Sequence, residues 1–206
     1  NWYHTVKTAV GSRIKWATGR FSCKWRQLKV KNMRYLSVVI GLLMLGRPGC
    51  TQPPEDRPPI ENPEFDEQLT RLLSFSVPVI GVQELRDIQE EVYIFDARER
   101  EEFEVSHIEG AQYLGYNKLN KKALRGLPKD STVVVYCSVG YRSEKISERL
   151  RERGFTKVYN LYGSIFEWVN QGYPVVTPEG KSTKQLHTYN RKWSKWVEEN
   201  QVNKVW

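Results

Sequence analysis

The chain has 206 residues, 39% of them hydrophobic, so it can form one folded domain with additional segments. Its net charge of +8 belongs to residues 1–32, which contain eight Lys or Arg and no acidic residue; the other 24 basic residues are balanced by 24 acidic ones. Because the basic charge is confined to the N-terminal segment, the composition does not support nucleic-acid binding, and we expect no nucleic-acid partner.

The three cysteines are far apart in the sequence. Cys23, Cys50 and Cys137 show none of the paired spacing that zinc sites and disulfide frameworks have, and the chain contains three histidines. We therefore expect neither a metal site nor a cofactor.

Residues 1–32 are basic, begin with Asn and lack a clear apolar periodicity, so we expect them to be disordered. Two explanations remain open, namely translation from upstream of a natural start at Met33, or a basic transit peptide for an organelle. We favour the first because residues 33–50 resemble an export signal, with a short basic start and an apolar run, 36–45, that is too short to cross a bilayer comfortably.

Cys50 follows this apolar run and stands where bacterial lipoproteins carry a lipidated cysteine. Arg47 and Pro48 depart from the usual lipoprotein pattern, so an ordinary signal peptide or a buried helix remains an alternative. The expected location is the periplasm or a membrane surface to which the N terminus is tethered. An organelle and the cytoplasm are the alternatives.

Residues 51–63 hold five of the ten prolines among charged residues, which predicts an extended linker. The folded domain is expected over 64–178. Within it, short apolar runs and amphipathic segments alternate. Strands are predicted at 77–80, 92–95, 111–114, 132–136 and 157–161, and helices at 65–73, 82–88, 99–105, 117–124, 144–153 and 165–170. This alternation predicts an α/β fold in three layers, with a parallel sheet flanked by helices.

The most informative stretch runs from the fourth of these strands into the helix that follows it. Thr132–Tyr136 is a β-branched run typical of a strand buried on both faces, and Gly154 stands where a glycine would end the helix. Cys137 therefore lies at the carboxyl end of a strand, in a tight loop that opens a helix. That is the usual ligand position in an open α/β sheet.

This position favours a reactive thiolate. A helix N terminus leaves N–H groups unpaired and carries partial positive charge, and both lower the pKa of a nearby thiol. Gly140 would let the loop N–H groups converge on the sulfur, and Arg142 adds a positive charge. The alternative is that Cys137 is an unreactive core thiol.

Four segments with characteristic order and spacing resemble the rhodanese family across about 64–176. They are Asp96-Ala97-Arg98-Glu99 with Glu102-Phe103, His107-Ile108-Glu109-Gly110-Ala111, Cys137-Ser-Val-Gly-Tyr-Arg142-Ser143, and Leu161-Tyr-Gly163-Ser-Ile-Phe166-Glu-Trp168 with Gly172-Tyr-Pro174-Val175. Ser106 and Ser164 stand where the family commonly has glycine. The resemblance implies a rhodanese-like three-layer fold with a five-stranded parallel sheet.

The resemblance also implies a sulfurtransferase in which Cys137 attacks the outer sulfur of thiosulfate or a similar sulfane donor and carries the sulfur as a persulfide. A thiol or cyanide, or a thiol on a protein partner, would accept it. Backbone N–H groups of the substrate-binding loop would stabilise the anionic persulfide. The residues of that loop are Ser138, Val139, Gly140, Tyr141, Arg142 and Ser143.

Three side chains outside the loop, those of Asp96, Arg98 and His107, are further candidates for the site. Asp96 and Arg98 lie at the end of a predicted strand and would either border the active site or hold loops together, and we favour the structural role. For His107 a packed structural role is favoured over a general base. Tyr141 is expected to border the pocket.

Two other functions compete with sulfur transfer. Cys-dependent phosphatases and arsenate reductases also use a Cys and an Arg around an anion, but the phosphatases that share this fold have five residues between them. Here four residues separate Cys137 from Arg142, and the smaller loop suits a sulfur atom. A protein-interaction module without turnover is the other alternative; the presence of Cys137 speaks against it but does not establish turnover. A persulfide carrier that serves one protein partner would look the same in sequence.

The C-terminal segment 179–206 is predicted to be an amphipathic helical extension. Its apolar residues, Leu186, Tyr189, Trp193, Trp196 and Val197, fall near one helical face. The favoured interpretation is that the extension folds back onto the domain, and the alternative is a helix for a membrane surface or a partner.

Overall fold

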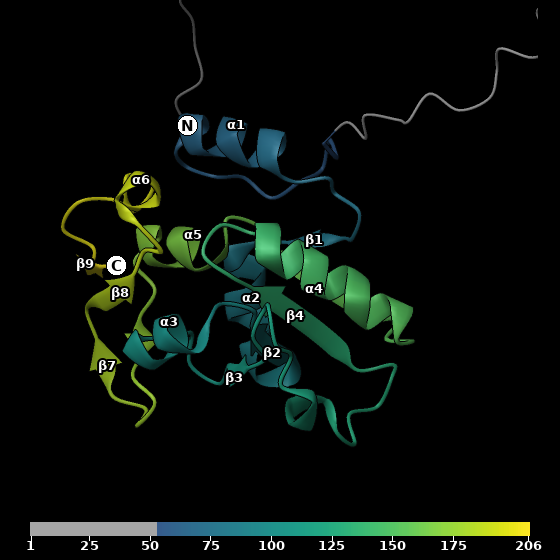
Figure 1. Ribbon diagram of the computed structural model, residues 1–206. Helices are drawn as coiled ribbons and strands as arrows, with labels where there is room; N and C mark the ends of the chain where they lie inside the picture. Colours follow the sequence, from purple (N-terminus) through teal and green to yellow (C-terminus); the bar gives the residue numbers. More distant parts are fainter. Residues whose placement is uncertain (1–52) are drawn as a thin grey trace, which may run out of the picture. The chain divides into compact units, whose positions relative to one another are not determined.

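The computed structural model describes residues 53–206, which contain a five-stranded parallel β-sheet covered by helices (Figure 1). The strands are β1 (Val79–Ile80), β2 (Tyr93–Asp96), β3 (Gln112–Tyr113), β4 (Thr132–Tyr136) and β5 (Lys157–Leu161). Their order is β1-β5-β4-β2-β3, and each neighbouring pair is parallel. The predicted α/β architecture is therefore confirmed.

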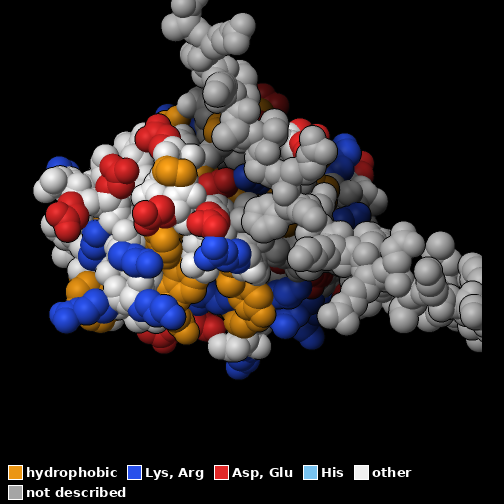
Figure 2. Space-filling model, turned by 90° about the horizontal axis from the view of Figure 1, so that it is seen from above, with side chains coloured by type: hydrophobic (Ala, Val, Ile, Leu, Met, Phe, Trp, Pro, Cys, Tyr) orange, Lys and Arg blue, Asp and Glu red, His pale blue; other side chains and the backbone are white. Residues whose placement is uncertain are grey.

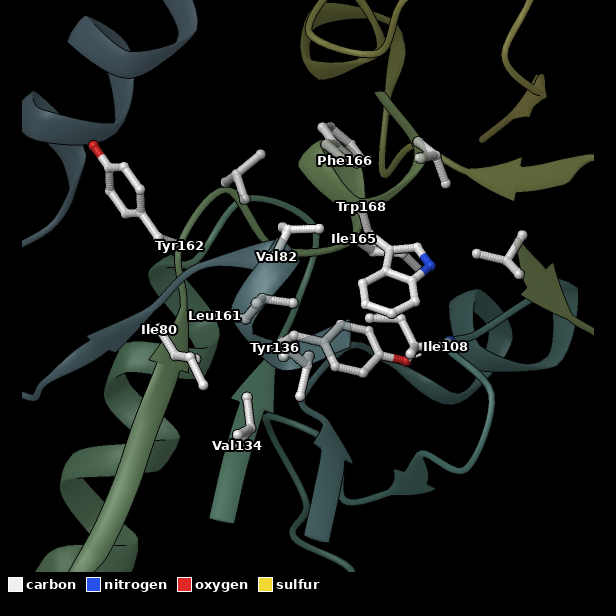
Figure 3. Close-up of a cluster of buried hydrophobic side chains, with 14 of the residues drawn as sticks. Ile80, Val82, Ile108, Val134, Tyr136, Leu161, Tyr162, Ile165, Phe166 and Trp168 are labelled. Atoms are coloured by element: carbon white, nitrogen blue, oxygen red, sulfur yellow. Dashed lines mark hydrogen bonds between the residues drawn. The ribbon is translucent and has the colours of Figure 1, made fainter. Parts of the chain in front are cut away.

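The central strand β4 is buried on both faces, which explains its uninterrupted apolar sequence. Val134 and Tyr136 point to one face and join a core that α1 (Pro63–Leu72), α2 (Val82–Ile88) and α5 (Ser164–Asn170) complete (Figure 3). Val133 and Val135 point to the other face and pack beneath α4 (Tyr141–Glu152). The sheet thus has a helical layer on each side.

The carboxyl ends of β2 and β4 lie side by side and carry the predicted site residues. Asp96 is paired in register with Tyr136, and the N–H of Ala97 donates to the Tyr136 carbonyl at 2.8 Å. The short helix α3 (Arg100–Val105) follows β2, and α4 follows β4. Because parallel strands end at one edge of the sheet, these two strand-to-helix loops meet there.

The predicted helix at 117–124 is wrong in most of its length. Only a 3₁₀ turn, η3 (Lys121–Leu124), forms there; a second 3₁₀ turn, η2 (Gln89–Glu91), extends α2. Asn120 explains the difference, because its N–H donates to the Leu114 carbonyl and its side-chain amide to the Tyr113 carbonyl. These bonds tie the segment back to β3 and prevent a regular helix.

The described part of the proline-rich segment contains a turn, in which the Arg57 N–H donates to the Pro54 carbonyl, and it is not a free spacer. Arg57 forms an ion pair with Asp66 of α1 at 2.6 Å, and Ile60 packs against the core. Asn62 caps α1 and Pro63 is its first residue, a position that proline favours because the missing N–H would have no helical partner there. The folded part of the chain therefore begins before residue 64.

The predicted C-terminal helix is wrong. Residues after α5 form the short strands β6 (Val175–Val176), β7 (Ser182–Thr183), β8 (Gln185–His187) and β9 (Asn203–Val205), with one four-residue helix, α6 (Arg191–Ser194). Leu186 is buried between more exposed strand neighbours, whereas Asn190 caps α6 through the N–H of Trp193. The helical spacing of apolar residues therefore arose from a strand, a turn and a short helix.

The extension nevertheless packs against the domain. Trp196 stacks on Phe65 of α1 with the ring centroids 5.4 Å apart, and the side chain of Asn170 of α5 bonds the Trp196 carbonyl and the N–H of Glu198. Figure 1 shows β8 beside α3, and these two elements are in contact. Residues 179–206 are thus part of the folded unit.

The surface of the described residues has no dominant charge. They contain 22 Lys or Arg and 24 Asp or Glu, and Figure 2 shows both kinds, with hydrophobic side chains, on the face seen from above. None of the helices within 53–206 has the length and hydrophobicity that a bilayer crossing requires. The predictions for 1–32, for 33–50 and for lipidation at Cys50 lie outside the described residues.

Candidate active site

Cys137 lies in the tight loop between β4 and α4. Gly140, the residue before α4, has a φ of 114°, a region that residues with a side chain rarely adopt. With this turn, the Gly140 N–H points back at the sulfur and donates to Cys137 Sγ at 3.1 Å. The loop therefore binds the sulfur with its own backbone, as its sequence predicts.

The N terminus of α5 supports the loop from behind. Ser164 Oγ accepts from the Cys137 N–H at 3.2 Å, and the N–H groups of Ile165 and Phe166 donate to the carbonyls of Cys137 and Ser138. Gly163, which precedes α5, has a φ of 72°, and a Cβ there would lie 2.5 Å from Glu167 Cβ. The position therefore requires glycine for both its conformation and its packing.

The environment of Cys137 favours the thiolate. The residue is 1% exposed, and burial raises the pKa of its thiol. The charge of Arg142 and hydrogen bonds from Ser143 and the Gly140 N–H lower the pKa, and together they outweigh burial, so the net pKa lies below the ordinary value. A lowered pKa distinguishes a nucleophilic thiol from a packed one.

Arg142 does not stand free beside the sulfur. Its guanidinium donates to the two carboxylate oxygens of Glu102 at 2.6 and 2.9 Å, and also to Ser138 Oγ at 3.0 Å. The Glu102 side chain is 4% exposed and belongs to α3, so the ion pair joins the two strand-to-helix loops. Burial raises the pKa of Glu102, but the contacts with Arg142, the charge of Arg98 and the Glu99 N–H together outweigh it, so the net pKa is lowered and the carboxylate is charged.

Glu102 is a site residue that the sequence does not identify as such, since it stands there only as part of the family pattern. Its side chain also accepts from the Glu99 N–H at 3.1 Å and completes a capping box at the start of α3. A Glu three residues after Glu99 is the sequence signal for that box. Nothing in the sequence places it opposite Arg142.

The other loop residues take different positions. Val139 is 6% exposed and packs into the core, whereas Tyr141 is 42% exposed at the rim. Ser143 is fully buried and bonds Asn160 of β5 at 2.6 Å. Asn160 in turn donates to the Gly140 carbonyl at 3.0 Å, so it fixes the turn.

Asp96 and Arg98 form an ion pair with both side chains fully buried, at 2.7 Å. Arg98 also donates to the Ser106 carbonyl at 2.6 Å. His107 stacks on Phe103, and its Nδ1 lies 3.1 Å from the Phe103 carbonyl. These contacts hold α3 and the following loop in place, which is the structural role favoured for all three residues.

A pocket of about 480 Å³ opens above Cys137. Its described lining combines the loop with residues of four other segments: Leu72, Glu99, Tyr116, Asn117, Cys137, Ser138, Val139, Tyr141, Arg142, Tyr189 and Trp193. Tyr189 and Trp193 come from the C-terminal extension, and nothing in the sequence indicates that they reach the site. Within 53–206, no group of three His, Cys, Asp or Glu side chains could hold a metal ion.

Residues 81–171 match the model of the rhodanese-like domain. Among curated proteins, the chain is 33% identical over 78 residues to the thiosulfate sulfurtransferase GlpE of Coxiella burnetii, covering 38% of this chain and 72% of that protein. It is 29% identical over 99 residues to the putative sulfur carrier protein YrkF of Bacillus subtilis, covering 47% of this chain and 53% of that protein.

A rhodanese-related protein from Thermoplasma volcanium is a structural neighbour with a TM-score of 0.44 and 27% identity, covering 48% of this chain and 98% of that one. The chain spans between a quarter and about half of the length of several curated relatives.

Proposed function

Because this chain belongs to the rhodanese family, we propose that it is a sulfurtransferase in which Cys137 carries sulfane sulfur as a persulfide. The observation that carries the proposal is the setting of Cys137 Sγ, which lies at the base of a pocket with the Gly140 N–H 3.1 Å away. The lowered pKa of the thiol supports the same role, since the thiolate is the nucleophile.

The proposed reaction has two steps. The Cys137 thiolate attacks the outer sulfur of thiosulfate or a similar donor, a new S–S bond forms, and the donor's S–S bond breaks, so that sulfite leaves with the bonding electron pair. The persulfide then passes its outer sulfur to a thiolate or to cyanide, and the Cys137 thiolate is regenerated. The Gly140 N–H donates to Cys137 Sγ, the atom that bears the negative charge before the sulfur is transferred, and this contact supports the first step.

A persulfide carrier that serves one protein partner is the second candidate. It is supported by the similarity to a putative sulfur carrier protein, and the same Cys137 chemistry would serve it. Turnover separates the two functions, because a carrier forms the persulfide but does not release its sulfur rapidly to a small acceptor.

Phosphatase activity is disfavoured by a contact at the site. Arg142, the residue that would bind a phosphate, is engaged by both oxygens of Glu102. A phosphate dianion would have to displace that carboxylate or lie against it, and two like charges at such a distance repel. This argument is independent of the four-residue spacing between Cys137 and Arg142.

The test incubates the protein with thiosulfate, or with an organic thiosulfonate, and cyanide, and follows thiocyanate. Wild type should exceed Cys137→Ala, and mass spectrometry after donor alone should show one added sulfur on Cys137. A persulfide without turnover would favour the carrier. Absence of both added sulfur and thiocyanate would refute sulfur transfer, and hydrolysis of an aryl phosphate by wild type but not Cys137→Ala would favour the phosphatase.

A further inference from the structure

The C-terminal extension forms one wall of the pocket above Cys137. Tyr189 and Trp193 line it together with the catalytic loop, although both lie beyond the segment 81–171 that matches the rhodanese-like domain. Tyr189 follows β8, and Trp193 belongs to α6. A segment outside the matched domain therefore shapes the space in which a sulfur donor must bind.

Tyr189 is held in an uncommon conformation to reach this place. Its φ of 65° lies in the left-handed region, and a bulky residue adopts it at a cost of about 1–3 kcal/mol. Hydrogen bonds fix the residues on both sides, since Thr188 N–H donates to Val205 O and Asn190 N–H donates to Thr188 O, each at 2.7 Å. The ring remains 53% exposed, so core packing does not account for the strain.

The Tyr189 ring instead faces the active-site arginine. The Arg142 guanidinium carbon lies 5.2 Å from the ring centroid, within the range of a cation–π contact. Arg142 is thus covered by an aromatic ring and bound by the carboxylate of Glu102. Three of its five N–H groups are engaged by Glu102 and Ser138, and its charge is offset by the Glu102 carboxylate.

The described lining of the pocket offers no other cation. Arg142 is the sole Lys or Arg among those residues, and Glu99 adds a negative charge at the wall. Nearby His187 lies 4.0 Å from Glu102, but burial lowers its pKa, so it is neutral at neutral pH. A doubly charged inorganic anion therefore finds the loop N–H groups but no free counter-charge.

The remaining lining is mainly apolar or aromatic, and it includes Leu72, Tyr116, Val139, Tyr141 and Trp193. A ligand that carries an apolar group binds favourably to such a wall, because its apolar surface is buried and an aromatic ring stacks on the side chains. We propose that Tyr189 and Trp193 make this site selective for sulfane sulfur carried by an apolar organic group, in preference to thiosulfate. This inference rests on the proposed sulfur transfer.

An aryl thiosulfonate monoanion illustrates the step. The Cys137 thiolate attacks its terminal sulfur, the S–S bond of the persulfide forms, and the bond between that sulfur and the sulfonyl group breaks. The aryl sulfinate leaves with the electron pair, and its ring lies between the pocket walls. Cyanide then takes the outer sulfur and leaves as thiocyanate, which returns the thiolate.

The experiment measures kcat/KM with cyanide and three donors: thiosulfate, methanethiosulfonate and benzenethiosulfonate. Wild type should prefer benzenethiosulfonate to methanethiosulfonate by at least about tenfold, and thiosulfate should be the poorest donor. Tyr189→Ala and Trp193→Ala should each lower the benzene-to-methane ratio roughly fivefold to tenfold. Tyr189→Phe should retain the ratio, because it keeps the ring.

Tyr93→Ala is the matched control, since Tyr93 is an exposed tyrosine on β2 outside the described pocket lining. Its ratio should equal that of wild type. Turnover with thiosulfate as the best donor, or equal ratios in wild type and both alanine variants, would overturn this inference and leave the proposed function intact. If no donor gives thiocyanate above Cys137→Ala, the proposed function fails and this inference fails with it.

Discussion

Glu102→Gln is the change that best tests how charge is arranged at the site. The Glu102 side chain is 4% exposed and accepts from Arg142 at 2.6 and 2.9 Å and from the Glu99 N–H at 3.1 Å. Glutamine keeps the shape but replaces one acceptor oxygen with a donor, so at least one charge-assisted bond is lost. Bonds of this kind contribute about 1.5–3 kcal/mol each, which predicts a fall in stability of about 2–3 kcal/mol.

The same substitution should make the Cys137 thiol more acidic, although it makes the protein less stable. With the carboxylate charge removed, the charge of Arg142 acts on Cys137 without compensation, and the pKa of the thiol should fall further. A lower pKa gives more thiolate at a pH below both values. The assay is the pH dependence of Cys137 alkylation by iodoacetamide, with thermal unfolding measured in parallel.

Glu101→Gln is the control, because Glu101 is an exposed residue of the same helix. It should leave both the alkylation midpoint and the stability near wild type. An unchanged or raised midpoint in Glu102→Gln would refute the reasoning, since it would mean that Glu102 acts by holding Arg142 in place rather than by offsetting its charge.

The stability difference should also depend on pH. The net pKa of Glu102 is lowered in the folded state, so its contribution is complete above the ordinary glutamate pKa and is lost as pH falls through the lower folded-state value. The free energies of unfolding of wild type and Glu102→Gln should therefore approach each other at acidic pH. A constant difference from pH 7 to strongly acidic pH would contradict this assignment.

Three further substitutions test the surroundings of the site. Ser164→Ala removes the acceptor of the buried Cys137 N–H and should lower the free energy of unfolding by about 1–3 kcal/mol. Ser164→Gly should be more stable than the alanine variant, because φ at this position is 53°. An alanine variant that proves more stable than the glycine variant in denaturation experiments would contradict this. Ser106→Ala should raise the free energy of unfolding by roughly 1 kcal/mol, since the buried Ser106 hydroxyl has no hydrogen-bond partner among the described residues. A less stable alanine variant would contradict this prediction. Asp96→Asn should destabilise the protein, because it leaves the buried Arg98 without the charge of Asp96. If the rate of thiocyanate formation falls while the melting temperature is unchanged, Asp96 has a direct catalytic role instead.

Local patterns in the sequence predicted the central strand of the sheet and the position of Cys137 at its end. A β-branched run at 132–136 is a buried strand in the structure, and both its bounds were predicted. The turn after it requires a residue that tolerates positive φ, and Gly140 supplies it, so Cys137 could be placed at a strand end with an N–H near its sulfur. These features depend on neighbouring residues, which is why one sequence was enough.

Tertiary structure decided everything that joins distant segments. Glu102 meets Arg142 across 40 positions because two parallel strands end at one edge of the sheet, and this contact changes Arg142 from a free cation into a neutralised one. Tyr189 and Trp193 reach the pocket because β8 pairs with β9 and because Asn190 caps the start of α6. Their spacing in the sequence instead predicts a single amphipathic helix. The periodicity of apolar residues indicates which side chains are buried. It does not indicate which side chains they contact, because those contacts depend on where the chain reverses direction.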